Sequence, residues 1–164
     1  MSGYYFSVTL HVLAALFWLG GMFFLAAVGA PVLRRIEPPA LRAELFRSLG
    51  LAFRRVGWVA IAVLVGTGVL NLQLRGLLTI EVWTNSEFWS LPYGRALLVK
   101  LVTVVLMIVL SAVHDFGLGP AAARAQVGSP AALALRRRSA WIARVNALLG
   151  LILVVAAVRL ARGG

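Results

Sequence analysis

Four long runs of apolar residues divide the chain, and each is about as long as a membrane-spanning helix. They cover about residues 4–29, 56–74, 93–114 and 141–160. A bilayer core about 30 Å thick needs roughly 20 apolar residues in a helix, so each run predicts one span. Prolines, glycines and arginines bound the runs, as expected where helices end or reach the membrane surface. The pattern predicts an all-α integral membrane protein, a four-transmembrane-helix bundle forming a single domain over residues 1–164.

The composition agrees with a membrane environment. Hydrophobic residues make up 62% of the 164 residues, and charged residues make up only 13%. A typical soluble domain has about a quarter of its residues charged, so this chain could not cover its apolar surface in water. The chain has no cysteine, which excludes a disulfide scaffold and a thiolate metal site.

The net charge of +11 follows the connections between the runs. Six arginines against two glutamates lie between the first two runs, and five arginines against one aspartate lie around the connection between the last two. Basic residues accumulate on the cytoplasmic side, so both termini and the middle connection are predicted to lie outside. No basic segment is interleaved with base-stacking aromatic residues, which favours an orienting role over nucleic-acid binding.

The middle connection, about residues 76–91, has a different character. Its few charges are balanced, and apolar and aromatic residues are interspersed among them. Such a segment is typical of the membrane interface. We therefore expect a short interfacial segment between the second and third helices.

Polar residues within the apolar runs are few, and they recur at helical spacing. In the third run they form one stripe with a methionine: Lys100, Thr103, Met107, Ser111 and His114. In the first run a similar stripe contains Ser7, His11, Ala14, Ala15, Trp18 and Met22. Ionisable groups are expensive in hydrocarbon, so both stripes should face the interior of the bundle.

Depth selects the polar groups that can meet. His11 and Lys100 each lie about seven residues from the outer end of their helix, on the order of 10 Å below the surface, and Asn71 approaches that level from the second helix. This predicts an outer-leaflet pocket built by these three residues, with Trp18 as a wall. His114 lies about 21 Å beyond Lys100 along the third helix, near the cytoplasmic face.

On these residues haem b is the expected cofactor and copper the alternative, because copper(I) favours thiolate and thioether ligands and a copper site here would have too few ligands. A neutral imidazole can be an axial haem ligand or a copper ligand, and a buried lysine can supply charge or a proton. We expect His11 to bind haem b or copper, Lys100 to act as a catalytic or charge-supplying group, and Asn71 and Trp18 to help hold the cofactor. His114 is a second candidate metal ligand. Structural roles at the helix interfaces are the alternative for each of these residues.

Three stretches resemble the copper-resistance D (CopD) family of bacterial inner-membrane proteins. The first, residues 10–21, has a histidine ahead of Trp-Leu-Gly-Gly; the second covers residues 53–71; the third, residues 92–101, has Tyr-Gly-Arg with a lysine five residues on. The resemblance spans about residues 5–115. It implies a multi-pass protein of the bacterial plasma (inner) membrane that handles copper, with a redox or copper-handling protein as a possible partner.

His11 and Lys100 are also similar to residues of HemJ-type protoporphyrinogen oxidases, which are four-span membrane proteins that bind haem b. This second resemblance implies haem-dependent oxidation of a porphyrinogen. A third hypothesis is a non-catalytic membrane subunit of a larger complex, in which the polar stripes serve only helix association. Whether the protein is an enzyme is left open by these alternatives.

Overall fold

A computed structural model describes residues 2–126 and 129–163. Helices account for all the regular structure in this part of the chain. In chain order they are α1 (Ser2–Phe24), the π-helix η1 (Leu25–Gly29), α2 (Ala30–Arg34), α3 (Pro39–Leu74), α4 (Ile80–Thr84), α5 (Ser86–Ser90), α6 (Pro92–Ala112), the π-helix η2 (Val113–Leu118), α7 (Gly119–Arg124) and α8 (Pro130–Ala161).

Four helical stretches are long and apolar enough to cross a membrane. They are Gly3–Arg34, Pro39–Leu74, Pro92–Ala122 and Pro130–Ala161. Each contains one of the four predicted apolar runs in full. The all-α, four-span class predicted from the sequence is therefore confirmed.

The helices extend well beyond the predicted spans on the arginine-rich side. The second helix was expected from residue 56 and begins at Pro39, and the fourth was expected from residue 141 and begins at Pro130. Most of the arginines assigned to loops are therefore helical. Arginine, alanine and leucine all favour helix, so the charges mark where the chain leaves the apolar layer and not where the helix ends.

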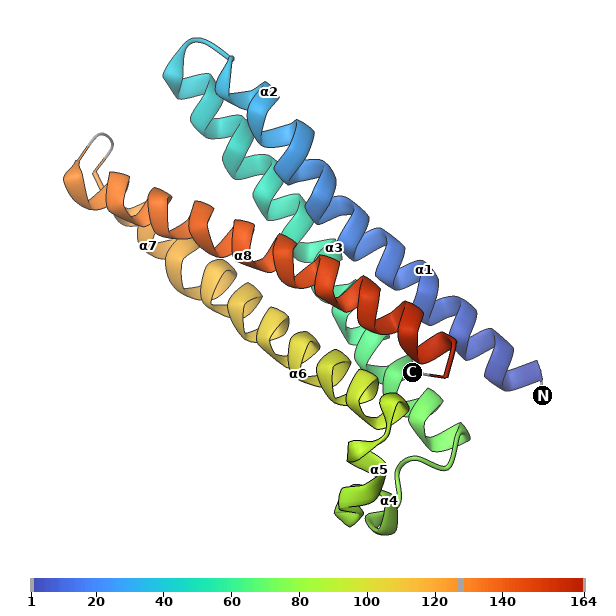
Figure 1. Cartoon of the computed structure of the whole chain (residues 1–164). Coiled ribbons are helices and arrows are strands. Elements are labelled where there is room, and N and C mark those ends of the chain that lie inside the picture. The colour runs from blue at the N-terminus through green and yellow to red at the C-terminus, as the bar shows by residue number, and fades with distance from the viewer. Residues whose placement is uncertain (1, 127–128, 164) are drawn as a thin grey trace. The chain divides into compact units, whose positions relative to one another are not determined.

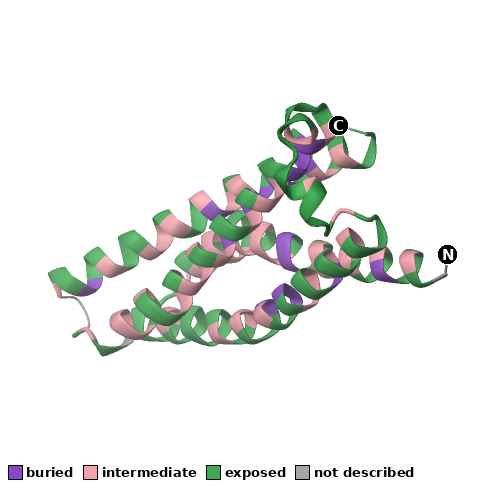
Figure 2. Cartoon of the chain, turned by 90° about the horizontal axis from the view of Figure 1, so that it is seen from below, coloured by how far each residue is buried: buried purple, intermediate pink, exposed green. Residues whose placement is uncertain are grey.

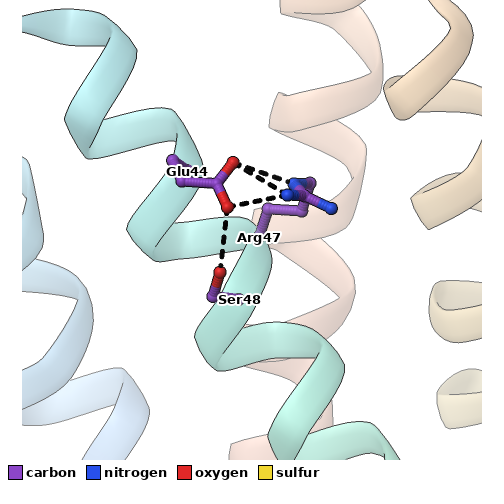
Figure 3. A network of polar contacts seen from close by, with 3 residues as sticks. All are labelled: Glu44, Arg47 and Ser48. Carbon is purple, nitrogen blue, oxygen red and sulfur yellow. Dashed lines mark hydrogen bonds and ion pairs between the residues drawn. The ribbon is translucent and has the colours of Figure 1, made fainter.

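Local side-chain bonds stabilise the helical extension of α3. Arg47 donates to both carboxylate oxygens of Glu44, with Nη2 2.7 Å from Oε1, and Ser48 Oγ donates to the same Oε1 at 3.2 Å (Figure 3). These partners are three and four residues apart, the spacing that brings side chains together on a helix. The α8 extension is capped by Ser129, whose hydroxyl accepts from Ala132 N.

The chain divides into two compact units, Met1–Thr84 and Asn85–Gly164, and each is a helical hairpin. In the first, the stretch from α1 to α2 lies beside α3; in the second, the stretch from α6 to α7 lies beside α8 (Figure 1). The two hairpins share their order of elements: a long helix, a π-helix, a short α-helix and a second long helix. Met107 follows Trp18 by the same number of residues as Pro120 follows Pro31. Trp18 and Met107 are both buried.

Most of the helix surface is exposed, as expected for helices that face lipid (Figure 2). Leu16 and Val105, for example, are 65% and 59% exposed. The core is narrow and contains small residues, which let helices approach closely in a membrane. The buried apolar residues are Trp18, Leu19, Ala60, Ile61, Ala96, Leu97, Met107, Ala132, Leu153 and Ala156.

Glycines mark the close approach of α1 to α3. A Cβ atom on Gly21 would lie 2.4 Å from Cε2 of Phe53, and one on Gly57 would lie 3.8 Å from Cδ1 of Trp18. The neighbouring Gly20 has open space around its Cβ position. The packing of α1 against Phe53 therefore favours glycine at position 21 and places no such demand on position 20.

The predicted interfacial segment contains the short helices α4 and α5. In α4, the exposed Glu81 carboxyl is hydrogen-bonded to the backbone N–H of Glu81 and to the Thr79 side chain. These bonds hold the pKa of the carboxyl below its ordinary value. In α5, the Asn85 side chain caps the helix by accepting from Glu87 N at 2.9 Å. The corner from α5 to α6 is tight, because a Cβ atom on Gly94 would lie 2.0 Å from the carbonyl oxygen of Phe88.

Candidate functional site

His11 on α1 is hydrogen-bonded to Thr67 on α3. The distance between His11 Nδ1 and Thr67 Oγ1 is 2.8 Å. Thr67 is 8% exposed, and the imidazole is half-buried beside Gly68, where a Cβ atom would lie 3.5 Å from His11 Cε1. In the first hairpin, the histidine ring is therefore held by a hydrogen bond to Thr67 and by packing against Gly68.

The bonds of Thr67 determine which ring nitrogen of His11 carries the proton. The Thr67 hydroxyl donates its hydrogen to the carbonyl oxygen of Val63 at 2.6 Å. Its oxygen can then only accept from His11, so Nδ1 is protonated and Nε2 carries the lone pair. This assignment follows from the hydrogen-bond network. Nε2 is thus the nitrogen with which His11 can bind a metal.

Asn71 lies one helical turn beyond Thr67 on α3, and Ser7 lies one turn before His11 on α1. Ser7 is 2% exposed. Ser7 Oγ and Asn71 Oδ1 are both buried and have no hydrogen-bond partner in the part of the chain that the structure describes. The structure therefore brings Asn71 to the same α1–α3 contact as His11, and adds Ser7, which sequence reasoning placed on the stripe without assigning it to the site.

Trp18 lies further along α1 and is 4% exposed. The Cβ position of Gly57 is 3.8 Å from its indole Cδ1, so the indole packs inside the first hairpin. A role as the wall of a cofactor pocket stays a prediction.

Lys100 belongs to the second hairpin and is half-buried on α6. Lys100 follows His11 by the same number of residues as Met107 follows Trp18. The two polar residues therefore occupy equivalent places in their hairpins. The placement of Lys100 beside His11 stays a prediction.

The rest of the α6 stripe is well defined. Thr103 is 5% exposed and Met107 is fully buried. Ser111 Oγ accepts a hydrogen bond from Asn146 Nδ2 of α8 at 2.9 Å. This contact shows that the stripe reaches the partner helix at Ser111.

His114 lies in η2, and its imidazole is 40% exposed. The distance from its Nδ1 to Asp115 Oδ1 is 2.9 Å. A carboxylate can only accept, so Nδ1 is the donor in this bond. Both histidines of the chain are therefore oriented through Nδ1 by an oxygen, as metal-binding histidines usually are. π-helical segments often occur at functional sites.

Within residues 2–126 and 129–163, no three side chains of the types His, Cys, Asp and Glu are grouped so that they could hold a metal ion. A hollow on the first hairpin between η1 and α3 is lined by apolar residues such as Phe24, Leu49 and Phe53, and offers no ligand atoms. Metal binding would thus depend on single histidines and on thioethers.

The comparisons with known proteins agree with the first resemblance. The family described as Copper resistance protein D (CopD) matches residues 49–160, more than half of the chain. The chain belongs to the copper-resistance D family. As a CopD member with four membrane-spanning helices, it is a multi-pass membrane protein with a copper-related function.

A relative supports the extent of this similarity. An uncharacterized protein of Aquifex aeolicus (strain VF5) is 30% identical over 156 residues, which cover 94% of this CopD chain and 92% of that protein. No solved structure gives a significant match. The family match contains Thr67, Asn71, Lys100 and His114 but begins after His11. The likeness to HemJ-type oxidases stays a prediction.

Proposed function

We propose that this CopD protein handles copper ions in the bacterial inner membrane, with His11 as the ligand in the outer half of the bilayer. The orientation of the His11 ring by Thr67 carries the proposal. Histidines that bind metals almost always donate their other N–H group to a fixed acceptor, which sets the tautomer and the ring orientation. His11 has this arrangement at the contact between α1 and α3.

The sparse donor set favours copper as transported cargo. Imidazole nitrogen and thioether sulfur suit copper, and thioethers select its reduced form. The methionines Met22 and Met107 lie on the same stripes as the histidines, and His114 supplies a second imidazole toward the other end of α6. Transport requires sites that bind an ion well enough to admit it and weakly enough to release it. Isolated ligands meet that requirement better than a four-ligand cage.

A substitution of Lys100 would distinguish copper from haem b in the pocket that the sequence predicts. An ammonium group beside a copper ion would oppose its binding, whereas the same group would attract a haem propionate. If the pocket takes copper, Lys100→Met should leave the affinity for copper unchanged or raise it. If the pocket takes haem with His11 as axial ligand, the same substitution should lower haem retention.

The decisive experiment is a titration of the detergent-purified protein with copper(I) against a chromophoric chelator, alongside its absorption spectrum. The chain has two histidines, so His11→Ala, His114→Ala and the double variant cover all imidazoles. We expect copper binding that is weakened by His11→Ala. A Soret band that disappears in His11→Ala would show that His11 binds haem, which would overturn the copper proposal and favour the HemJ-like oxidase. A colourless protein that binds no copper, with all variants equally stable, would leave the non-catalytic subunit.

A further inference from the structure

A line of polar side chains follows the α1–α3 contact from the outer end of the first hairpin to His11. Its two ends are defined by hydrogen bonds, one between Arg75 and Tyr4 and one between His11 and Thr67. We call this line the polar seam. Its members are Tyr4, Ser7 and His11 on α1, Thr67 and Asn71 on α3, and Arg75, the C-cap residue of α3.

The register of the hairpin places Ser7 and Asn71 at one level, between these two bonds. The two helices are antiparallel, and each residue advances about 1.5 Å along its helix. From the Tyr4–Arg75 end to His11, the residue numbers of the seam rise by three and then four on α1 and fall by four at each step on α3. Side chains with this spacing lie on one face of a helix. The two residues therefore face the same part of the seam.

At this level, one oxygen on each helix has no hydrogen-bond partner among residues 2–126 and 129–163. Ser7 is 2% exposed, and both its Oγ and Asn71 Oδ1 are buried without a hydrogen bond. Buried polar groups in folded proteins are nearly always bonded to protein or to ordered water. Two orphaned oxygens at one level, on opposite helices, indicate a place that water fills.

We propose that the polar seam is a hydrated access path from the outer surface to His11, and that the Tyr4–Arg75 pair closes its outer end. The proposal rests on the proposed function only in taking His11 as the end of the path. The path admits water and, with it, a small hydrated cation.

The closing pair is suited to open by side-chain rotation. Arg75 Nε donates to the Tyr4 hydroxyl at 2.8 Å, Nη2 donates to the same oxygen, and the guanidinium carbon is 5.5 Å from the centre of the Tyr4 ring. Arg75 is exposed and Tyr4 is half-buried. The guanidinium places a positive charge at the mouth of the path, which opposes cations while the pair is closed.

Cysteine labelling tests the path, because the natural chain contains no cysteine. Ser7→Cys and Asn71→Cys are made singly and treated from outside with a small, membrane-impermeant methanethiosulfonate reagent. Phe6→Cys is the matched control, since Phe6 is adjacent in depth but 72% exposed to the surroundings of the helix. Thiolates react with this reagent, so a thiol facing lipid reacts poorly.

We expect both seam cysteines to react faster than the control. Adding Tyr4→Phe removes the hydroxyl that accepts both Arg75 hydrogen bonds but keeps the ring. It should raise the rate by at least about three- to tenfold, the factor that one net hydrogen bond represents. Unreactive seam cysteines in both backgrounds, in variants that elute as the natural protein does, would show a dry seam and overturn the proposal. Equal reaction of the Phe6→Cys control would do the same.

The labelling is done without copper, so its outcome is separate from that of the proposed function. A seam that reacts in a protein that binds no copper keeps the hydrated path and overturns only the copper function. Copper binding with an unreactive seam does the reverse.

Discussion

The imidazole of His11 is bonded through Nδ1 to the hydroxyl of Thr67, 2.8 Å away on the other helix of the same hairpin. Because Thr67 already donates to the Val63 carbonyl, the direction of the bond is fixed and the lone pair stays on Nε2. The chemistry available to the histidine is thus decided by a residue that carries no charge.

Thr67→Val keeps the shape of the side chain and removes the acceptor. We expect copper binding to weaken by about 10- to 100-fold, the usual effect of losing a partner of a metal-binding histidine. Thr67→Ser retains the hydroxyl and should bind nearly as the natural protein does. Chelator competition measures both. Natural affinity in Thr67→Val, with loss in His11→Ala, would mean that His11 binds copper without being oriented by Thr67.

Gly21→Ala should destabilise the first hairpin, whereas Gly20→Ala should not. The new methyl group at position 21 would lie 2.4 Å from the Phe53 ring, and the one at position 20 meets nothing within 4 Å. Overpacking of this kind costs about 1–3 kcal/mol. Thermal unfolding in detergent compares the two variants. Phe53→Leu added to Gly21→Ala should restore part of the loss, and equal melting temperatures for the two single variants would contradict the packing.

Gly94→Ala should displace α5 from the start of α6. The obstacle is the backbone carbonyl of Phe88, 2.0 Å from the new atom, which no rotamer change relieves. Gly117→Ala is the control, because its Cβ position is open. Limited proteolysis between residues 84 and 92 should become faster in Gly94→Ala only. Unchanged cleavage would show that the corner adjusts without loss of structure.

The positive-inside rule predicts that the segment with α4 and α5 lies outside and the α3 extension inside. Ser86→Cys at the start of α5 should react with an impermeant reagent applied to intact cells. Ser48→Cys, on the α3 extension, should react only after the membrane is opened. The opposite pattern would reverse the orientation.

The spans were predictable because hydrocarbon thickness imposes a length on apolar runs. Their ends were not, because arginines that leave the apolar layer still favour helix, as at Arg47. The stripe containing His11 was predictable from spacing. Its bond to Thr67 was not, since it depends on the register of α1 against α3, which periodicity on one helix leaves open. The π-helices η1 and η2 carry no sequence signal that we recognise.

The bond between His11 and Thr67 lies entirely within the first hairpin. The orientation of the imidazole therefore needs only the packing of the first two long helices and no contact from residues 85–164. Changes in the later half of the chain can then arise without disturbing how the histidine is held. Such independence would let related proteins acquire new partners or cargo around an unchanged ligand.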